Sequence, residues 1–176
     1  MKIIETERLS LRLFTHGDAP FILKLLNQPG WLRFIGDRGI NNEEDARSYI
    51  ETKLIAAYRK YGYGLYAVEL KGEDAVIGMC GLVKRDWLDD VDIGFAMFSC
   101  YEGHGYATEA AQAVLNHAHD THGLWRILAI TTGDNNRSIR LLNKIGMKYE
   151  KSIKDPGDES ILELYSIESG DRHEYQ

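Results

Sequence analysis

Residues 101–110 read YEGHGYATEA and place Gly103 and Gly105 directly before a run of alanines. Glycine loses more conformational freedom on folding than any other residue, so two glycines before a helix indicate an unusual backbone angle or a close approach to the main chain. Residues 93–98 before them are predicted to form a strand, and alanines at helical spacing follow. A strand, a glycine loop and a helix start together present free N–H groups that suit an anion, above all a phosphate. A tight connection that binds nothing is the alternative.

Two familiar phosphate loops do not fit this stretch. The Walker pattern requires Gly-Lys-Ser/Thr, which is absent, and a dinucleotide fingerprint would place a third glycine where Thr108 stands.

Composition predicts one globular domain over residues 1–169, followed by a polar tail over residues 170–176. The 21 Lys and Arg residues against 27 Asp and Glu, with no basic stripe, argue against nucleic acid as a partner. The chain shows no signal peptide and no apolar run of membrane-spanning length, so we expect no membrane partner and a cytoplasmic location. Cys80 and Cys100 are expected to be reduced thiols that are buried or lie in strands.

Hydrophobic periodicity predicts an α/β (α+β) protein. A strand over 9–13 is followed by a helix that begins at Asp18 and ends at Pro29 and Gly30, a loop over 31–39, and a helix from Asn42 to Gly62. Further strands are expected over 65–70, 76–83, 93–98, 126–131, 147–153 and 161–167, with helices after the glycine loop and over 138–145. This order predicts a mixed, mostly antiparallel twisted sheet flanked by helices.

Three fragments follow one another along the chain: ETERLSLR near the start, DIGFAMFSCYEGHGYATEA in the middle and TGDNNRSIRLLNKIGM late. In this order they resemble the GNAT superfamily of N-acetyltransferases, most closely the branch of ribosomal-protein N-terminal acetyltransferases (Rim-type). The resemblance covers nearly the whole chain. It implies the GNAT fold, acetyl-CoA as co-substrate and no metal.

The resemblance also implies which residues hold acetyl-CoA. The glycine loop would bind the diphosphate, the preceding strand would offer main-chain groups to pantetheine, Asn135 would contact the pantetheine arm, and Ser138 would contact the thioester sulfur. Capping of a helix start is the alternative role of Asn135 and Ser138, and both roles can coexist. The implied cofactor-binding residues are Ala96, Met97, Phe98, Gly103, His104, Gly105, Tyr106, Ala107, Thr108, Asn135 and Ser138.

Two positions depart from the family pattern. Cys100 stands where Gln or Arg is usual, three residues before the first glycine, which weakens one part of the motif without removing main-chain donors. Leu142 stands where many members have a tyrosine, so a phenol cannot act as the acid from that position.

Asp92 is the candidate general base, because the resemblance places an acidic residue at the start of this strand. It could act through a water molecule. The alternative is that Asp92 belongs to a solvated turn with Asp86, Asp89 and Asp90.

Acceptor recognition is expected from the segment between the first predicted strand and the rest of the sheet, because the resemblance implies a variable lid there, and one loop of this segment holds the candidate residues. Trp31, Arg33, Phe34 and Asp37 combine aromatic and charged groups, as binding surfaces often do. The alternative for Trp31 and Phe34 is that they only close the core.

The predicted activity is transfer of an acetyl group to a primary amine, of a protein N-terminus or a small molecule, by direct attack while both substrates are bound. A non-catalytic acyl-CoA sensor and a nucleotide-phosphate enzyme using the same loop are the alternatives. A homodimer through an exposed strand edge is left open.

Overall fold

The computed structural model describes residues 1–169, so the predicted tail over 170–176 lies outside the described residues. Its eight strands form one sheet in the order β1-β2-β3-β4-β5-β6-β8-β7. All neighbouring strands are antiparallel except β5 and β6, which are parallel, so the predicted mixed sheet is confirmed. The strands are β1 Lys2–Glu5, β2 Leu9–Arg12, β3 Leu65–Leu70, β4 Ala75–Val83, β5 Asp92–Met97, β6 Arg126–Thr131, β7 Lys148–Lys154 and β8 Ile161–Glu168.

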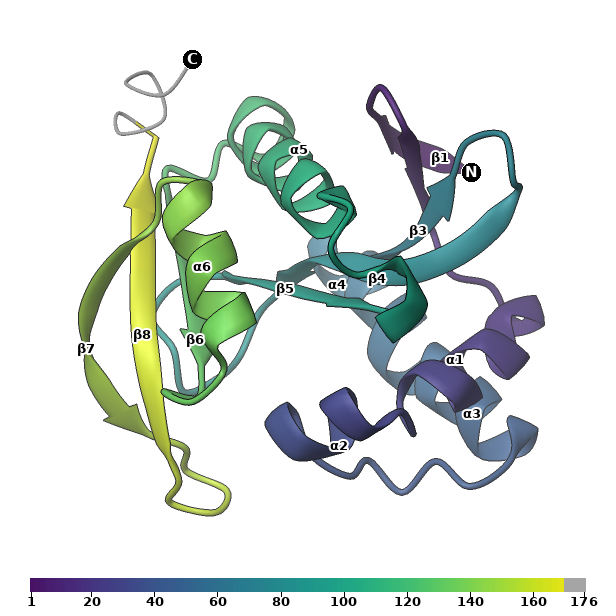
Figure 1. Cartoon of the computed structure of the whole chain (residues 1–176), viewed down its shortest axis with the longest axis horizontal. Coiled ribbons are helices and arrows are strands. Elements are labelled where there is room, and N and C mark those ends of the chain that lie inside the picture. The colour runs from purple at the N-terminus through teal and green to yellow at the C-terminus, as the bar shows by residue number, and fades with distance from the viewer. Residues whose placement is uncertain (170–176) are drawn as a thin grey trace.

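Helices cover both faces of the central strands. Figure 1 shows α5 (Tyr106–His122) on one side of β4 and β5 and the group formed by α1, α2 and α3 on the other, while α6 (Asn136–Lys144) lies against β6. The first group comprises α1 Ala19–Leu25, α2 Pro29–Phe34 and α3 Glu43–Tyr49, which continues through a π-helical turn, Ile50–Ile55, into α4 Ala56–Tyr61. No helix within residues 1–169 is both long and apolar enough to cross a membrane.

Helix α5 lies close to the sheet because its inward face is built from small residues. Ala110, Ala111, Val114, Leu115 and Ala118 are all buried and belong to the larger hydrophobic core. The helix begins directly after Gly105 and ends at Gly123, both with left-handed backbone angles. The sequence pattern therefore predicted both the helix and the face that it buries.

Three local predictions were wrong. Pro29 and Gly30 were expected to end a helix, but they open α2, because proline is tolerated in the first turn, where its missing N–H would have no partner. Strand β1 was not predicted, and it pairs with β2 at the edge of the sheet. Cys80 is buried in β4 as expected, but Cys100 is exposed in the short 3-10 turn that follows β5.

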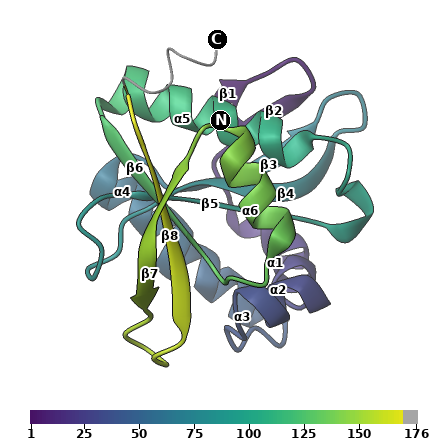
Figure 2. The ribbon, with the colours of Figure 1, turned by 60° about the vertical axis from the view of Figure 1, so that its left-hand side comes forward.

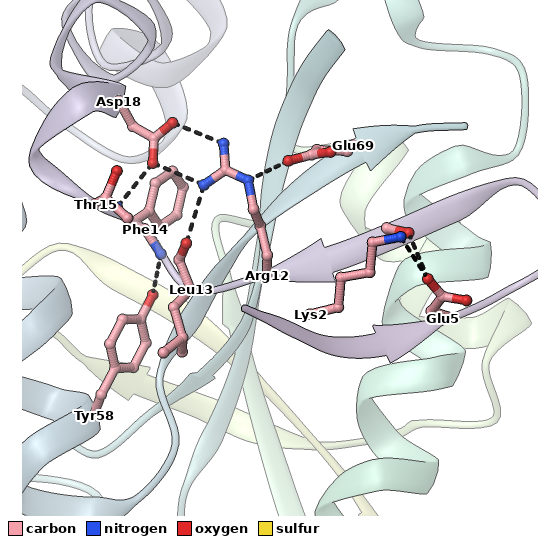
Figure 3. Close-up of polar contacts among 10 residues, drawn as sticks. Lys2, Glu5, Arg12, Leu13, Phe14, Thr15, Asp18, Tyr58 and Glu69 are labelled. Carbon is pink, nitrogen blue, oxygen red and sulfur yellow. Dashed lines mark hydrogen bonds and ion pairs between the residues drawn. The ribbon is translucent and has the colours of Figure 1, made fainter. Parts of the chain in front are cut away.

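One guanidinium joins the N-terminal hairpin to the first helices, as Figure 3 shows. Arg12 donates two hydrogen bonds to the carboxylate of Asp18, at 2.9 and 2.8 Å, and pairs with Glu69 on the neighbouring strand β3. Burial raises the pKa of Asp18, but the bonds from Arg12 and the Thr15 N–H outweigh it and hold that pKa below its ordinary value. The pair fixes the chain where it leaves β2 for α1.

Close packing of β3 on β4 yields a stability prediction. A Cβ atom at Gly81 would lie 2.1 Å from the carbonyl oxygen of Gly64. Gly81→Ala should therefore lower the free energy of unfolding by about 2 kcal/mol or more, because the main chain must shift. The matched control is Gly30→Ala, where a Cβ would meet nothing within 4 Å and should stabilise α2 slightly. Urea unfolding checks both, and equal midpoints for the two variants would contradict the prediction.

Candidate active site

The glycine loop has the backbone that its sequence predicted. Gly103 and Gly105 have φ angles of +85° and +81°, in the left-handed region that side chains rarely adopt. The first bond of α5 runs from the Glu109 N–H to the Gly105 carbonyl, at 3.0 Å. Among the described residues, the N–H groups from Gly103 to Thr108 donate to no protein acceptor. The loop thus offers a row of free amides at the positive end of a long helix.

The space around these amides suits an anion. A Cβ atom added at Gly103 would meet no heavy atom within 4 Å, and Gly103, His104 and Gly105 are exposed. The ring of His104 lies 5.6 Å from the ring of Tyr106, measured between centroids, at the edge of this space. A diphosphate has the charge and the acceptor oxygens that such a loop requires.

A second feature is the gap between β5 and β6. These strands share a single register pair, Asp92 with Leu128, supported by a hydrogen bond of 2.9 Å from the Leu128 N–H to the Val91 carbonyl. Beyond that pair no further pairing joins the two strands. The glycine loop follows the end of β5, and the loop to α6 follows the end of β6, so both loops stand at the open end of the gap.

Hydrogen-bond alternation decides which main-chain groups face this gap. The Phe98 N–H donates to the carbonyl of Ile77 in β4, at 2.9 Å, so Phe98 and, two residues earlier, Ala96 direct their main-chain groups toward β4. Met97 and Phe95 therefore direct their main-chain groups toward β6, and no strand within residues 1–169 pairs with them on that side. Of the three residues predicted to offer main-chain groups to pantetheine, only Met97 points them into the gap.

The sequence analysis missed Gln28 at the junction of α1 and α2. Its Nε2 donates to the Met97 carbonyl at 2.9 Å, and its Oε1 accepts from the Ser99 N–H at 3.3 Å. Gln28 therefore occupies one of the acceptors at the open end of the gap and leaves the Met97 N–H free. An isolated glutamine carries no sequence signal for such a role.

Asn135 caps the start of α6, which is one of the two roles that the sequence predicted for it. The Asn135 side chain accepts a hydrogen bond of 3.3 Å from the Ser138 N–H, which is a helix cap. The Ser138 hydroxyl is half-buried and makes no hydrogen bond with any described residue. Leu142 is fully buried. The main chain of Ser138 is thus used for capping, and its hydroxyl stays available.

Asp92 is not part of a solvated turn. It is only 1% exposed, and its carboxylate accepts a hydrogen bond of 2.9 Å from Nε of Arg85, whereas Asp86 and Asp89 are exposed. Burial raises the pKa of Asp92 to about 6 against the opposing effect of Arg85. Ile93 and Met97 pack in the core that contains α5, so Asp92 lies on the opposite face of the sheet.

The four residues predicted to contact the acceptor differ in exposure. Trp31 is buried in the core around α1 and α3, and its indole N–H has no partner among the described residues. Arg33 is exposed and lies over the ring of Phe34, at 4.6 Å from the ring centroid. Asp37 is exposed and accepts from the Gly39 N–H at 2.8 Å. Arg33, Phe34 and Asp37 are therefore placed where a ligand could reach them, and Trp31 is a core residue.

Two ion pairs connect α2, the start of α6 and the glycine loop at the open end of the gap. Arg33 of α2 lies 3.6 Å from Asp134 in the loop before α6, and Arg137 in the first turn of α6 lies 3.1 Å from Glu102 beside the glycine loop. Figure 2 shows α2 beside the end of α6 at which that helix begins. The glycine loop, the cap of α6 and α2 thus surround the open end of the gap.

A separate hollow of about 260 Å³ lies under the loop between β4 and β5. Trp87, Arg126 and Leu164 contribute to its walls, together with Leu128, the register partner of Asp92. None of its lining residues belongs to the glycine loop or to α6. It is therefore distinct from the opening described above.

Comparison with known proteins identifies the family. Residues 8–148 match the acetyltransferase (GNAT) domain, which spans most of the chain and includes the strands and helices around the gap. The protein belongs to the GNAT acetyltransferases. The resemblance in the sequence is thereby confirmed.

Relatives of this GNAT protein match it over most of their length, and solved structures share its fold. An uncharacterized N-acetyltransferase, YnaD, of Bacillus subtilis is 30% identical over 151 residues, covering 86% of this chain and 85% of the relative. A GNAT-family acetyltransferase structure from Bacillus anthracis has a TM-score of 0.80 at 28% identity, covering 95% of this chain and 98% of the other. RimL, a ribosomal L7/L12 α-N-protein acetyltransferase solved with coenzyme A, has the same fold, with a TM-score of 0.80 at 19% identity and coverage of 97% and 100%.

The cap of α6 allows the structural role of the Asn135 motif to be separated from a chemical one. Asn135→Ala should lower the free energy of unfolding by about 1 kcal/mol, because the Ser138 N–H loses its acceptor. Ser138→Ala keeps that N–H and removes a hydroxyl without a protein partner, so its unfolding midpoint should match the wild type. Chemical denaturation of both variants is the measurement, and an equal loss in Ser138→Ala would show that its hydroxyl is structural.

Proposed function

We propose that this GNAT protein transfers an acetyl group from acetyl-CoA to a primary amine, by direct attack of the amine while both substrates are bound. The observation that carries the proposal is the row of free amides from Gly103 to Thr108 beside the unpaired end of β5. The free amides would hold a diphosphate, and the unpaired end of β5 would pair with an extended amide chain such as pantetheine.

Acetyl-CoA supplies an activated thioester, and the chain would hold it with main-chain groups. The N–H groups of Gly103, Gly105 and the first turn of α5 would bind the diphosphate, with the side chain of His104 at its edge. The Met97 N–H points into the gap and would bind pantetheine or stabilise negative charge on the reacting carbonyl oxygen. Ala96 and Phe98 would contribute by packing, because their main-chain groups face β4.

Ser138 is proposed to donate a hydrogen bond to the departing sulfur. A thiol with a pKa of about 8.5 is already a fair leaving group, so one hydrogen bond suffices. The hydroxyl is free for this role because the cap of α6 uses only the Ser138 N–H. Leu142 offers no alternative acid, and Asn135 would orient the pantetheine arm from the same helix start.

Asp92 is proposed to accept a proton from the amine through water. It lies on the face of the sheet opposite α5, at the point where β5 and β6 separate. An N-terminal amine has a reference pKa of about 8, so roughly one-tenth is neutral at pH 7, and a base with a pKa near 6 is ionised there and can take up the proton.

The acceptor is proposed to be the amine of a protein N-terminus or of a small molecule, entering beside α2. Arg33 and Asp37 are exposed at this entrance, Phe34 is half-buried beside Arg33, and Trp31 supports the entrance from the core. RimL is a ribosomal-protein α-N-acetyltransferase by its name, which supports a peptide N-terminus as one class to test.

The activity test is thiol release. The purified protein should release free thiol from acetyl-CoA only when an acceptor amine is added, in a screen of N-terminal peptides, polyamines, aminoglycosides and amino acids. Calorimetry with CoA, ATP and NAD provides the binding control, and CoA alone should bind. Binding of CoA with no turnover of any acceptor would favour the acyl-CoA sensor, and binding of ATP or NAD instead would favour a nucleotide enzyme.

The second test concerns pH. Because Asp92 must be ionised to act as a base, kcat/KM calculated from the concentration of neutral amine, which removes the titration of the acceptor itself, should fall as pH drops through about 6, the value to which burial raises the pKa of Asp92. Asp92→Asn should remove this limb and lower kcat/KM about a hundredfold. Asp90→Asn is the matched control, since Asp90 lies just before β5 and pairs with Arg126 of β6, so this variant should leave the limb in place. A profile with an intact limb in Asp92→Asn would exclude Asp92 as the base.

A further inference from the structure

Arg8, in the turn between β1 and β2, lies behind the glycine loop. Its Nη1 donates to the His104 carbonyl at 2.9 Å, and its guanidinium carbon lies 4.6 Å from the centroid of the Tyr106 ring. A Cβ atom at Gly105 would lie 3.3 Å from Nη2 of Arg8. The guanidinium thus touches three consecutive residues of the loop, and these contacts come from a segment 96 residues earlier in the chain.

The bond to the His104 carbonyl fixes the direction of the next amide. In a trans peptide the carbonyl and the following N–H point in opposite directions within one plane. With the His104 carbonyl held toward Arg8, the Gly105 N–H must point away from it. Gly105 on the C-terminal side of this peptide has no Cβ atom to restrict its φ angle, so the peptide plane could otherwise turn over. Arg8 therefore selects the orientation in which the Gly105 N–H faces the open side of the loop.

Glu109, in the first turn of α5, holds Arg8 in place. Its Oε1 accepts from Nε of Arg8 at 2.7 Å, and its Oε2 accepts from the Arg8 N–H at 3.0 Å and from the Thr6 hydroxyl at 2.5 Å. Burial raises the pKa of Glu109, but the bonds from Thr6 and Arg8 outweigh it and hold that pKa below its ordinary value. Glu109 is therefore an anion close to the loop, and Arg8 compensates its charge.

We infer that Arg8 is a positioning residue for the diphosphate of CoA: it orients the Gly105 amide from behind the loop and does not bind the phosphates itself. The inference rests on the proposed function, because it presumes that the free amides of the loop bind this diphosphate. If Arg8 has this role, the N-terminal hairpin contributes to the affinity for CoA although it lies outside the gap between β5 and β6.

The test is CoA binding by calorimetry. Arg8→Gln should weaken CoA binding about tenfold, since the charged bond that orients the loop is lost. Arg8→Lys keeps the charge but loses the fork that reaches both Glu109 and His104, so it should also weaken binding. It serves as the second variant if Arg8→Gln is unstable. Pantetheine lacks the diphosphate, and its affinity, measured by competition against labelled CoA, should be equal in wild type and variants.

Two control variants separate the orientation of the Gly105 amide from the loss of a positive charge and from destabilisation of the hairpin. Lys2→Gln removes a cation from the same hairpin, where Lys2 pairs with Glu5 at 3.1 Å, and should leave CoA affinity unchanged. The double variant Arg8→Gln/Glu109→Gln removes the uncompensated anion and should stay as weak as Arg8→Gln, because the carbonyl is still unanchored.

Three results would overturn the inference alone: wild-type CoA affinity in Arg8→Gln, restored affinity in the double variant, or an equal loss of pantetheine affinity. A wild-type protein that bound no CoA would instead overturn the proposed function and this inference together.

Discussion

The separation of β5 from β6 is the constraint on which the rest of this structure depends. In a closed sheet, each strand satisfies the main-chain groups of its neighbours, and an unpaired group inside a protein is costly. Here pairing stops after Asp92 and Leu128, so the following groups of β5 need another partner. The side chain of Gln28 donates a hydrogen bond to the Met97 carbonyl, and the Met97 N–H remains open to a ligand.

The same separation places an opening between the two faces of the sheet. Helix α5 and its glycine loop lie on one face of β5, and Asp92 lies on the other, on the side of α1 and α3. A gap between strands connects the two faces without a channel through packed side chains. Exposed ion pairs between Arg33 and Asp134 and between Arg137 and Glu102 lie across the segments around this opening.

Burial divides the acidic residues of the loop between β4 and β5 into two kinds. Asp86 and Asp89 are exposed and solvated, as expected of a turn, whereas Asp92 is enclosed beside Arg85. A carboxylate in such a place is destabilised by the loss of water and stabilised by the guanidinium, and the balance leaves its pKa near 6. Sequence could not separate these residues because the distinction lies in what packs against each one.

The sequence by itself determined the strands and helices whose patterns are local: the alanine face of α5, the glycines at its start, and the cap of α6. These depend on periodicity and on backbone angles, which residues within a few positions set. The tertiary structure decided which distant segments meet: Gln28 on Met97, and Arg8 behind His104. Each of these is a contact between a side chain and main chain that are far apart in the sequence, and no local pattern encodes which partners folding will bring together.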